Sequence, residues 1–459
     1  MNSKTNFFVY TLVCLLILLF SFVNEFISII FAIFFGFLLI WRSKIDVLIG
    51  LIVLYVIKQN FYHIIDYKTM GSVVEGDFIR ENFVIFGFPL NLPTLACFFV
   101  PVRVIFEQVT NKNTFLKHNF LYRLWLFALI PGFISFILSF ITRDPNWTRG
   151  FRFLLLSSSF FYGLILTKDL TNISFNLFIK YLLLIITISL FLLNINFFWS
   201  HLVFLFIGLS SSFSIFFLFK KNIIDKTFGI LTLLFTLLIV INSTITFMLI
   251  CLLSFSLIIL SWTTKNKTTT IKNNNIIRIK YFLLFISIIF PFIVIFIGNI
   301  IGLEIGYIDV SSNSGFRKRL LEKVLLDRYP FWVSAFNQII NGPYFFVTSG
   351  RPLLVNGLDS QFEWIVGAHN VVLEVFRNTG ILVGCIILYI YLYTLNQLFN
   401  ILVNNNNNLI KTVTTALLGV AISGILTGDF PADMTIGFFL WGLCGLVVGI
   451  NEKRLNNFS

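Results

Sequence analysis

The residues best suited to chemistry lie in one stretch of the C-terminal third of the chain. His369 opens the segment 367–380, and Arg328 lies upstream, four residues before Trp332. An imidazole has an ordinary pKa of about 6.5, so it can serve as a base or an acid near neutral pH. An arginine presents a planar fork that holds two oxygens of a phosphate or carboxylate. We therefore take His369 and Arg328 as the candidate catalytic residues, suited to proton transfer beside an anionic group.

The composition predicts the kind of scaffold that must hold these residues. Of the 459 residues, 58% are hydrophobic and 12% are charged, which is more apolar surface than one soluble core can bury. Apolar runs near or above the roughly 18 residues needed to cross a bilayer recur along the chain. The sequence thus predicts an all-α polytopic membrane protein with about 12–14 transmembrane helices.

The net charge of +13 does not indicate a nucleic-acid partner. Most lysines lie in short loops between apolar runs, which is where membrane orientation requires positive charge. The five cysteines lie in apolar segments without a CxxC spacing, so neither a disulfide framework nor a thiolate metal site is indicated. No Asp-rich metal motif is present in the sequence either, and we expect neither a metal nor a cofactor.

The alternation of spans and loops divides the chain into three regions. Residues 1–301 form a transmembrane region with external loops near 58–83 and 143–152, residues 302–368 form a large external loop, and residues 369–459 form the C-terminal transmembrane helices. Lysine-rich loops mark the inner side, so both termini are expected in the cytoplasm. The large external loop is expected to contain surface helices.

Several segments carry more detailed expectations. The run 84–102 contains three prolines and predicts a kinked or broken span. Residues 263–280 are rich in Asn, Thr and Lys and predict a mobile cytoplasmic linker, whereas 344–368 predict an irregular covering loop. Further spans are expected at about 124–141, 153–167, 175–194, 201–219, 227–243, 245–261, 281–301, 381–399, 412–426 and 435–450.

The external positive charges are mostly arginines, although topology requires only positive charge. This preference suggests binding of phosphate or carboxylate groups. Ordinary salt bridges with neighbouring Asp and Glu residues are an equally good explanation for any single arginine. The external arginines are Arg143, Arg149, Arg152, Arg317, Arg319, Arg328, Arg351 and Arg377.

Helical spacing and capping residues predict how the external segment is built. Residues 314–327 have apolar side chains at helical spacing and predict an amphipathic helix on the membrane surface. A second helix is expected over 330–340, begun by a proline and ended by an Asn-Gly-Pro turn. Asn370 is the expected N-cap of a third helix, in which Glu374 can pair with Arg377.

This region resembles the C-terminal signature of the O-antigen polymerase and O-antigen ligase superfamily. The resemblance covers about residues 315–395 and implies a polytopic, metal-independent glycosyltransferase. Such enzymes use undecaprenyl-diphosphate-linked sugars at the outer face of the bacterial inner membrane. The matching residues are Arg328, Trp332, Ala335, Asn341-Gly342-Pro343, His369-Asn370, Leu373-Glu374, Gly380 and Gly384.

The resemblance assigns roles and partners as expectations. His369 corresponds to the family's loop histidine, Arg328 to its arginine before the tryptophan, and Arg149 or Arg152 to a further functional arginine. Arg149, Arg152, Arg319 and Arg351 are the candidates for binding the substrate diphosphate. The expected partners are the lipid-linked oligosaccharide and membrane lipids, and the resemblance also allows a chain-length regulator protein.

Two alternatives to a polymerase remain open at this point. An O-antigen ligase uses the same donor but transfers the finished chain to lipid A-core, and the motifs do not separate the two activities. A lipid-linked oligosaccharide flippase belongs to another class, in which internal repeats and charges at mid-membrane are typical. We detect no repeat, and nearly all charges lie at loop depth, with Lys180 as the exception.

Overall fold

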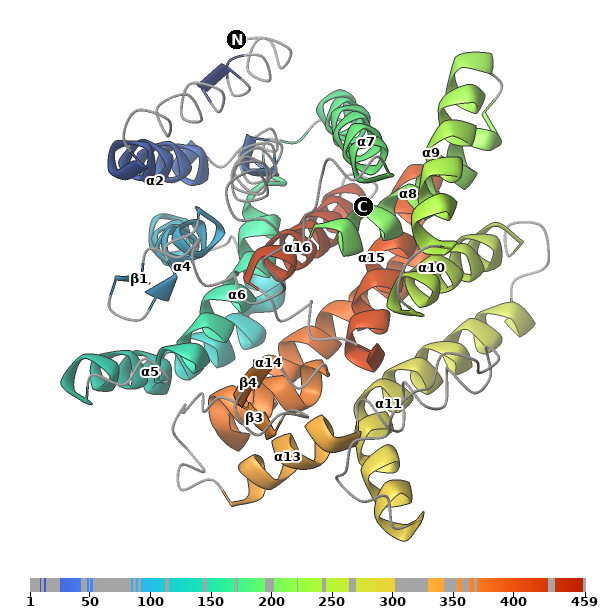
Figure 1. The fold of residues 1–459 in the computed structure, drawn as a ribbon. Helices are drawn as coiled ribbons and strands as arrows, with labels where there is room; N and C mark the ends of the chain where they lie inside the picture. The colour runs from blue at the N-terminus through green and yellow to red at the C-terminus, as the bar shows by residue number, and fades with distance from the viewer. Residues whose placement is uncertain are drawn as a thin grey trace, which may run out of the picture.

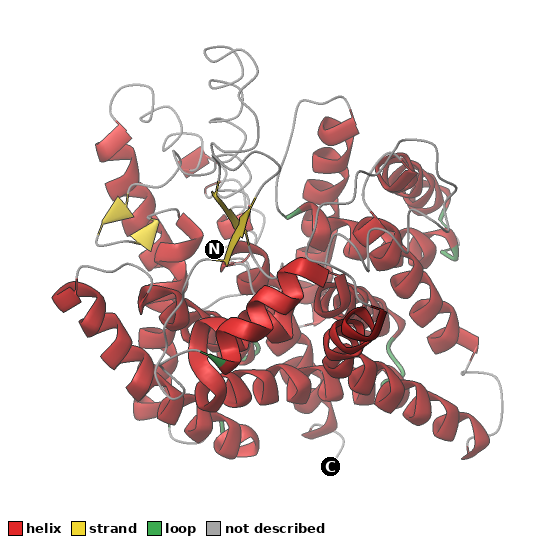
Figure 2. Ribbon diagram, turned by 60° about the horizontal axis from the view of Figure 1, so that its bottom comes forward, coloured by secondary structure: helices red, strands yellow, loops and turns green. Residues whose placement is uncertain are grey.

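The computed structural model is almost entirely helical in the part of the chain that it describes (Figures 1 and 2). Helices α6, α14, α15 and α16 occupy the middle of the molecule in Figure 1, and α2, α5, α7, α9 and α11 surround them. The described residues are 9, 12–13, 25–42, 48, 50–52, 84–85, 88–89, 92–111, 115–142, 147–168, 170, 172–194, 202–220, 222–241, 245–263, 270–301, 329–341, 353–356, 363–366, 370–427 and 434–456.

The described helices follow the apolar runs of the sequence. In chain order they are α2 (Glu25–Arg42), α4 (Leu92–Thr110), the short 3₁₀ helix η2 (Leu116–His118), α5 (Asn119–Thr142), α6 (Trp147–Ile165), α7 (Asn172–Asn194), α8 (Val203–Leu218), α9 (Ile223–Ile241), α10 (Ile245–Thr263), α11 (Thr270–Ile301), α13 (Tyr329–Ile340), α14 (Val371–Asn404), α15 (Asn408–Thr427) and α16 (Met434–Asn456). The spans expected at about 227–243 and 245–261 correspond to two separate helices, because α9 ends at Ile241 and α10 begins at Ile245.

The chain carries apolar helices that could span a membrane. Among the described residues, α14 and the segment Ile436–Lys453 of α16 are long and apolar enough to do so. A third candidate arises if Lys280–Ile286 and Ile288–Ile300 of α11, which are bent by 47° relative to each other, form one span. Shorter apolar segments lie in α5, α6, α7, α8, α10 and α15.

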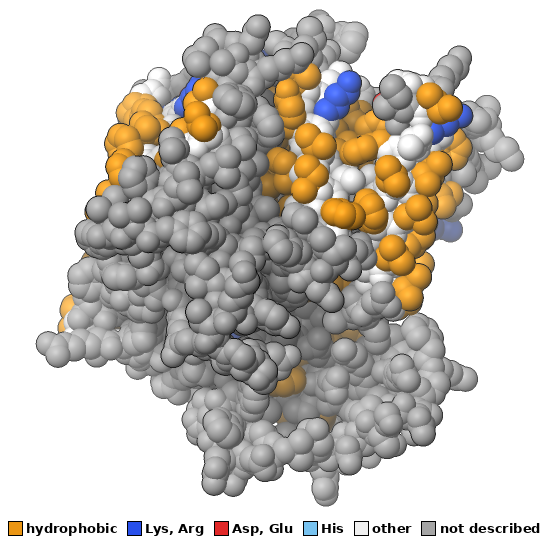
Figure 3. All heavy atoms as spheres, turned by 45° about the horizontal axis from the view of Figure 1, so that its top comes forward, with side chains coloured by type: hydrophobic (Ala, Val, Ile, Leu, Met, Phe, Trp, Pro, Cys, Tyr) orange, Lys and Arg blue, Asp and Glu red, His pale blue; other side chains and the backbone are white. Residues whose placement is uncertain are grey.

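Large apolar side chains face outward on several of these helices. Examples are Ile141 of α5, Ile230 of α9 and Phe296 of α11, all of which are exposed. Figure 3 shows apolar side chains gathered over the described part of one face, with lysine and arginine side chains at a few places. An apolar surface of this extent is expected where lipid or another protein covers the helices.

The closest helix packing joins α6 and α16 through glycines. A Cβ added to Gly445 would overlap the carbonyl oxygen of Phe160, and one added to Gly163 would overlap the carbonyl oxygen of Gly442. Small residues allow two helix backbones to approach each other in this way, as at many helix contacts in membranes. The glycines therefore fix the two helices in the centre of the molecule.

Polar contacts tie together helix ends that the sequence assigns to the cytoplasmic side. Lys453 Nζ donates to the carbonyl oxygen of Lys168 at 2.8 Å, and Lys168 Nζ pairs with Glu107. Lys280 Nζ donates to Asn400 Oδ1 at 3.2 Å. The observed grouping of these ends agrees with the alternation of spans.

Helix α14 is divided by a break at Gly380. This residue has φ 73° and ψ 173°, a conformation that favours glycine because it has no Cβ. One turn later Gly384 leaves room for the ring of Phe376, whose Cδ1 would lie 2.6 Å from an added Cβ. The first nine residues of α14, 371–379, thus form a separate short helix.

The structure corrects two expectations about helix boundaries in the first half of the chain. The run 84–102 is not a single kinked span, because β1 (Val84–Ile85) pairs antiparallel with β2 (Phe88–Pro89) before α4 begins at Leu92. A proline in the first helical turn costs no hydrogen bond, which is why Pro93 does not prevent this start. Likewise 143–152 is not wholly a loop, because α6 begins at Trp147.

Two further expectations were wrong in the second half. The predicted mobile linker 263–280 is helical from Thr270 onward, and Lys280 is buried by packing against α14. The predicted irregular loop contains the antiparallel hairpin of β3 (Leu353–Asn356) and β4 (Glu363–Val366). Both hairpins lie in the same half of the molecule in Figure 2. The predicted surface helix 314–327 and the external loop 58–83 lie outside the described residues.

Candidate functional site

The N-terminus of α13 is anchored on α11 by Tyr329. Its hydroxyl donates to Asn299 Oδ1 at 2.6 Å, and its ring lies so close to Gly298 that a Cβ there would overlap it. Tyr329 is 3% exposed, so both its ring and its hydroxyl are held in place. Arg328 immediately precedes this anchored residue in the sequence and lies outside the described residues.

One buried cluster connects α11, α13 and the first turn of α14. Trp332 is 1% exposed and lies in this cluster with Leu373 of α14. The cluster consists of Val294, Ile295, Tyr329, Trp332, Val333, Ala335 and Leu373. The cluster therefore holds the residue that follows Arg328 together with a residue one helical turn after His369.

The predicted cap of α14 is confirmed. Asn370 is extended (φ −152°, ψ 124°), and its Oδ1 accepts a hydrogen bond from the backbone N–H of Leu373 at 3.1 Å. Asn370 is fully buried, which places the helix start inside the protein. Asn370 thus marks the positive end of the helix dipole, and His369 directly precedes it in the sequence.

A buried polar network occupies the next turn of α14. Arg377 Nη2 donates to Glu374 Oε1 at 2.6 Å, which confirms the predicted pairing at helical spacing. Asn378 Nδ2 donates to the same carboxylate oxygen at 2.7 Å and to the Glu374 carbonyl oxygen at 2.7 Å. The Arg377 and Glu374 side chains are only 2% and 14% exposed. The external arginine Arg377 is therefore explained by an ion pair.

Some buried polar atoms of α13 and the start of α14 have no hydrogen-bond partner among the described residues. Two of them are the indole Nε1 of Trp332 and the Oδ1 of Asn378. One is a donor and the other an acceptor, and leaving either unpaired in a buried place costs free energy. Groups of this kind are typical of a site that receives a further polar group.

Among the predicted site residues, the structure gives the backbone setting of Arg149 and Arg152 alone. Arg149 and Arg152 lie in the first turns of α6, and their side chains are outside the described part. Arg328 directly precedes α13 and His369 directly precedes Asn370. Arg319, Arg328, Arg351 and His369 lie outside the described residues.

His118 connects η2 to the C-terminal parts of α14 and α16, a contact that sequence reasoning did not predict. We expected it to be structural, and it is buried between Tyr393, whose hydroxyl is 3.0 Å from Nδ1, and Glu452, whose Oε1 is 3.2 Å from Nε2. Both partners are distant in the sequence, so no local signal could reveal this contact. It joins η2 to α14 and α16.

Among the described residues, no group of three or more His, Cys, Asp or Glu side chains is placed to hold a metal ion. The cysteines described, Cys251, Cys385 and Cys444, are free thiols. No protein-family model matches the chain, and a comparison with curated proteins finds no significant match.

Proposed function

We propose that the protein is a polytopic enzyme of the bacterial inner membrane that extends a surface polysaccharide at the outer face. In this proposal a growing chain is transferred from undecaprenyl diphosphate to the terminal sugar of another lipid-linked repeat unit. About 12–14 spans would cross the bilayer, with both termini in the cytoplasm and residues 302–368 outside.

The observation that carries the proposal is the buried cluster shared by α11, α13 and α14. The cluster contains both Tyr329 and Leu373. In the sequence, Tyr329 directly follows Arg328, and Leu373 comes four residues after His369. The cluster lies at the α11 and α14 ends opposite to the Lys280–Asn400 contact. The proposal assigns Arg328 and His369 to one site because Arg328 directly precedes Tyr329 in the sequence and His369 directly precedes Asn370, the cap of α14.

The reaction needs one proton acceptor and one group that neutralises the leaving diphosphate. The hydroxyl oxygen of the acceptor sugar attacks the anomeric carbon of the donor, and the bond from that carbon to the diphosphate oxygen breaks. His369 takes the hydroxyl proton, an effect worth about 10²–10⁴ in rate. Arg328, with Arg149 or Arg152, binds the departing diphosphate through paired N–H donors, and Arg319 and Arg351 are further candidates for this contact.

The start of α14 also favours the binding of an anion. A helix N-terminus favours an adjacent anion, because its first N–H groups point outward and the helix dipole is positive there. The Glu374 carboxylate in the first turn would oppose this, but it is paired with Arg377. The capped segment 371–379 thus has its positive end at Asn370, the residue that follows His369 in the sequence.

A deletion strain tests the proposal through its glycan ladder. Loss of a polymerase leaves lipid A-core capped by a single repeat unit. Loss of a ligase leaves uncapped core and stranded polymer, and accumulation of lipid-linked units on the cytoplasmic side indicates transport. A ladder of wild-type length in the deletion strain would refute all three activities.

Complementation by variants then tests the two residues. His369→Ala and Arg328→Lys should each abolish polymer, because alanine cannot accept the proton and lysine lacks the bidentate fork. Arg278→Lys is the matched control, because Arg278 is an exposed arginine of α11 on the predicted inner side. Immunoblots of the membrane fraction establish equal insertion. Full-length polymer with either site variant would remove that residue from the mechanism.

A further inference from the structure

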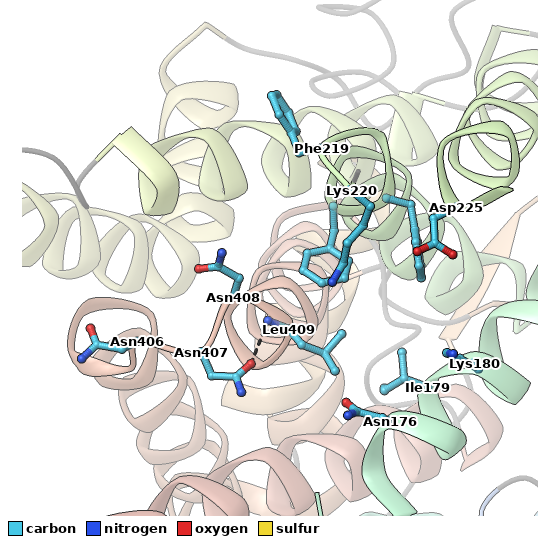
Figure 4. A pocket seen from close by; sticks show the side chains of 12 residues that line it. Asn176, Ile179, Lys180, Phe219, Lys220, Asp225, Asn406, Asn407, Asn408 and Leu409 are labelled. Atoms are coloured by element: carbon cyan, nitrogen blue, oxygen red, sulfur yellow. Dashed lines mark hydrogen bonds between the residues drawn. The ribbon is translucent and has the colours of Figure 1, made fainter. Parts of the chain in front are cut away.

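A cavity of about 700 Å³, lined by polar and apolar side chains, lies between α7, the α8–α9 connection and the α14–α15 connection, far in the sequence from the proposed catalytic residues. By the alternation of spans, the ends of α8 and α14 and the starts of α7, α9 and α15 all face the cytoplasm. Figure 4 shows the side chains that surround it. They belong to Asn176, Ile179, Lys180, Phe216, Phe217, Phe219, Lys220, Asp225, Asn406, Asn407, Asn408 and Leu409.

The charges around the cavity favour an anion. Lys180 and Lys220 supply two ammonium groups against the single carboxylate of Asp225. No salt bridge joins either lysine to a carboxylate in the part of the chain that the structure describes. Lys220 Nζ lies 4.7 Å from the centre of the Phe216 ring, which directs its side chain over the cavity wall. Lys180 belongs to α7 and Lys220 to the α8–α9 connection, so two different segments supply the cations.

Amide side chains add neutral hydrogen-bonding groups to this wall. Asn407 is used by the fold, because its Oδ1 accepts from the N–H groups of Leu409 and Ile410 at 2.9 and 3.2 Å and caps α15. Asn176, Asn406 and Asn408 are exposed and line the same cavity. They can donate to ester or hydroxyl oxygens, while Ile179 and Leu409 provide an apolar base.

An apolar path leads away from the cavity along α7. Lys180, Leu184 and Ile188 are spaced by four residues and therefore lie on one face of this helix. Leu184 and Ile188 are 44% and 50% exposed, although both are large apolar side chains. The same face thus carries a cation at the cytoplasmic end and apolar side chains toward the membrane interior. A free phosphate would use only the first of these features.

We propose that this cavity binds the headgroup of an anionic phospholipid from the cytoplasmic leaflet. The phosphate diester lies between Lys180 and Lys220, the headgroup hydroxyls contact the asparagine amides, and one acyl chain lies along Leu184 and Ile188. The proposal rests on the membrane orientation given above but is independent of the glycosyl transfer. A lysine near an anionic lipid surface contributes enough to change affinity about fivefold.

The test measures the thermal unfolding of the full chain in a mild detergent during titration with three probes. Phosphatidylglycerol should raise the apparent Tm in a saturable way, whereas phosphatidylcholine and inorganic phosphate should not. Lys180→Gln and Lys220→Gln should each weaken the phosphatidylglycerol effect about fivefold, and the double variant about 25-fold. Lys226→Gln is the matched control, because Lys226 is an exposed lysine of α9 that does not line the cavity, and it should change the effect less than twofold.

Three outcomes would overturn the proposal. An equal shift with inorganic phosphate would show that the cavity takes the phosphate group without the lipid, and an equal shift with phosphatidylcholine would exclude selection by charge. A loss in Lys226→Gln as large as in the double variant would exclude this cavity. Native mass spectrometry of the wild-type protein is independent of variant folding: retention of phosphatidylglycerol over phosphatidylcholine is expected, and equal retention contradicts the proposal. None of these readouts depends on polymer formation.

Discussion

Removing one partner of the Glu374–Arg377 pair should strongly destabilise the protein. Their side chains are 14% and 2% exposed, and Nη2 lies 2.6 Å from Oε1, so either single change leaves a charge in a buried place without this partner. Breaking a buried pair in this way costs about 3–5 kcal/mol. Glu374→Met also removes one of the two hydrogen bonds that Asn378 Nδ2 donates, worth about 1 kcal/mol within that range.

A double-mutant cycle measures how much of this cost belongs to the pair. Glu374→Met and Arg377→Met are each expected to lower the free energy of unfolding by about 3–5 kcal/mol. The double variant should lose about 2 kcal/mol less than the sum of the single variants, because it leaves no unpaired charge. Unfolding by SDS in mixed micelles, followed by circular dichroism, gives these free energies.

Lys226→Met is the control for the loss of a cation. Lys226 is exposed and lies on α9, so its replacement should change the free energy of unfolding by less than about 0.5 kcal/mol. Strictly additive losses in the cycle, or single variants as stable as the wild type, would show that the ion pair does not hold residues 371–379 of α14 in place.

Two glycine substitutions test close contacts described above. Gly298→Ala should push Tyr329 from its seat and cost about 1–3 kcal/mol, with a matching fall in polymer yield. Gly445→Ala should cost a similar amount by meeting the carbonyl of Phe160, and membrane abundance should fall on immunoblots. Gly36→Ala is the control for both, because nothing lies within 4 Å of the added Cβ. Wild-type stability in Gly298→Ala or Gly445→Ala would show that this close contact does not contribute to the free energy of unfolding.

Local signals predicted local structure well. Asn370 caps α14, and Glu374 pairs with Arg377. The helix expected over 330–340 is α13, which begins one residue earlier, at Tyr329. Each of these features depends on groups within four residues of one another, so the sequence contains the whole interaction. The spacing of the apolar runs likewise predicted most helix centres, because a helix that faces lipid or a buried core needs continuous apolar side chains.

Contacts between distant segments account for what the sequence did not reveal. Residues 270–280 have the composition of a linker, yet they are helical, and Lys280 bonds to Asn400, 120 residues further along the chain. His118 meets Tyr393 across 275 residues. Lys180 and Lys220, which are 40 residues apart in the sequence, line one cavity. The hydropathy of a segment is set by its own side chains and does not indicate which distant residues it contacts.

In the candidate site, too, the sequence predicted the local features but not the contacts between distant segments. His369 and Arg328 could be chosen from residue type and spacing, and the resemblance depends on those residues. That their neighbours share a cluster depends on Val294 and Ile295 of α11, which carry no chemical signal. The unpaired Trp332 and Asn378 atoms could not be recognised before the packing was known.

The glycine contact between α6 and α16 has a consequence for biosynthesis. Phe160 and Gly445 are separated by more than half of the chain, so a ribosome must make all the intervening helices before the two backbones can meet. Until α16 emerges, the face of α6 that receives it has no partner of matching shape. Assembly of the central helices is therefore a late, post-insertion event, and truncation before Met434 should yield a chain that enters the membrane but is cleared by quality-control proteases.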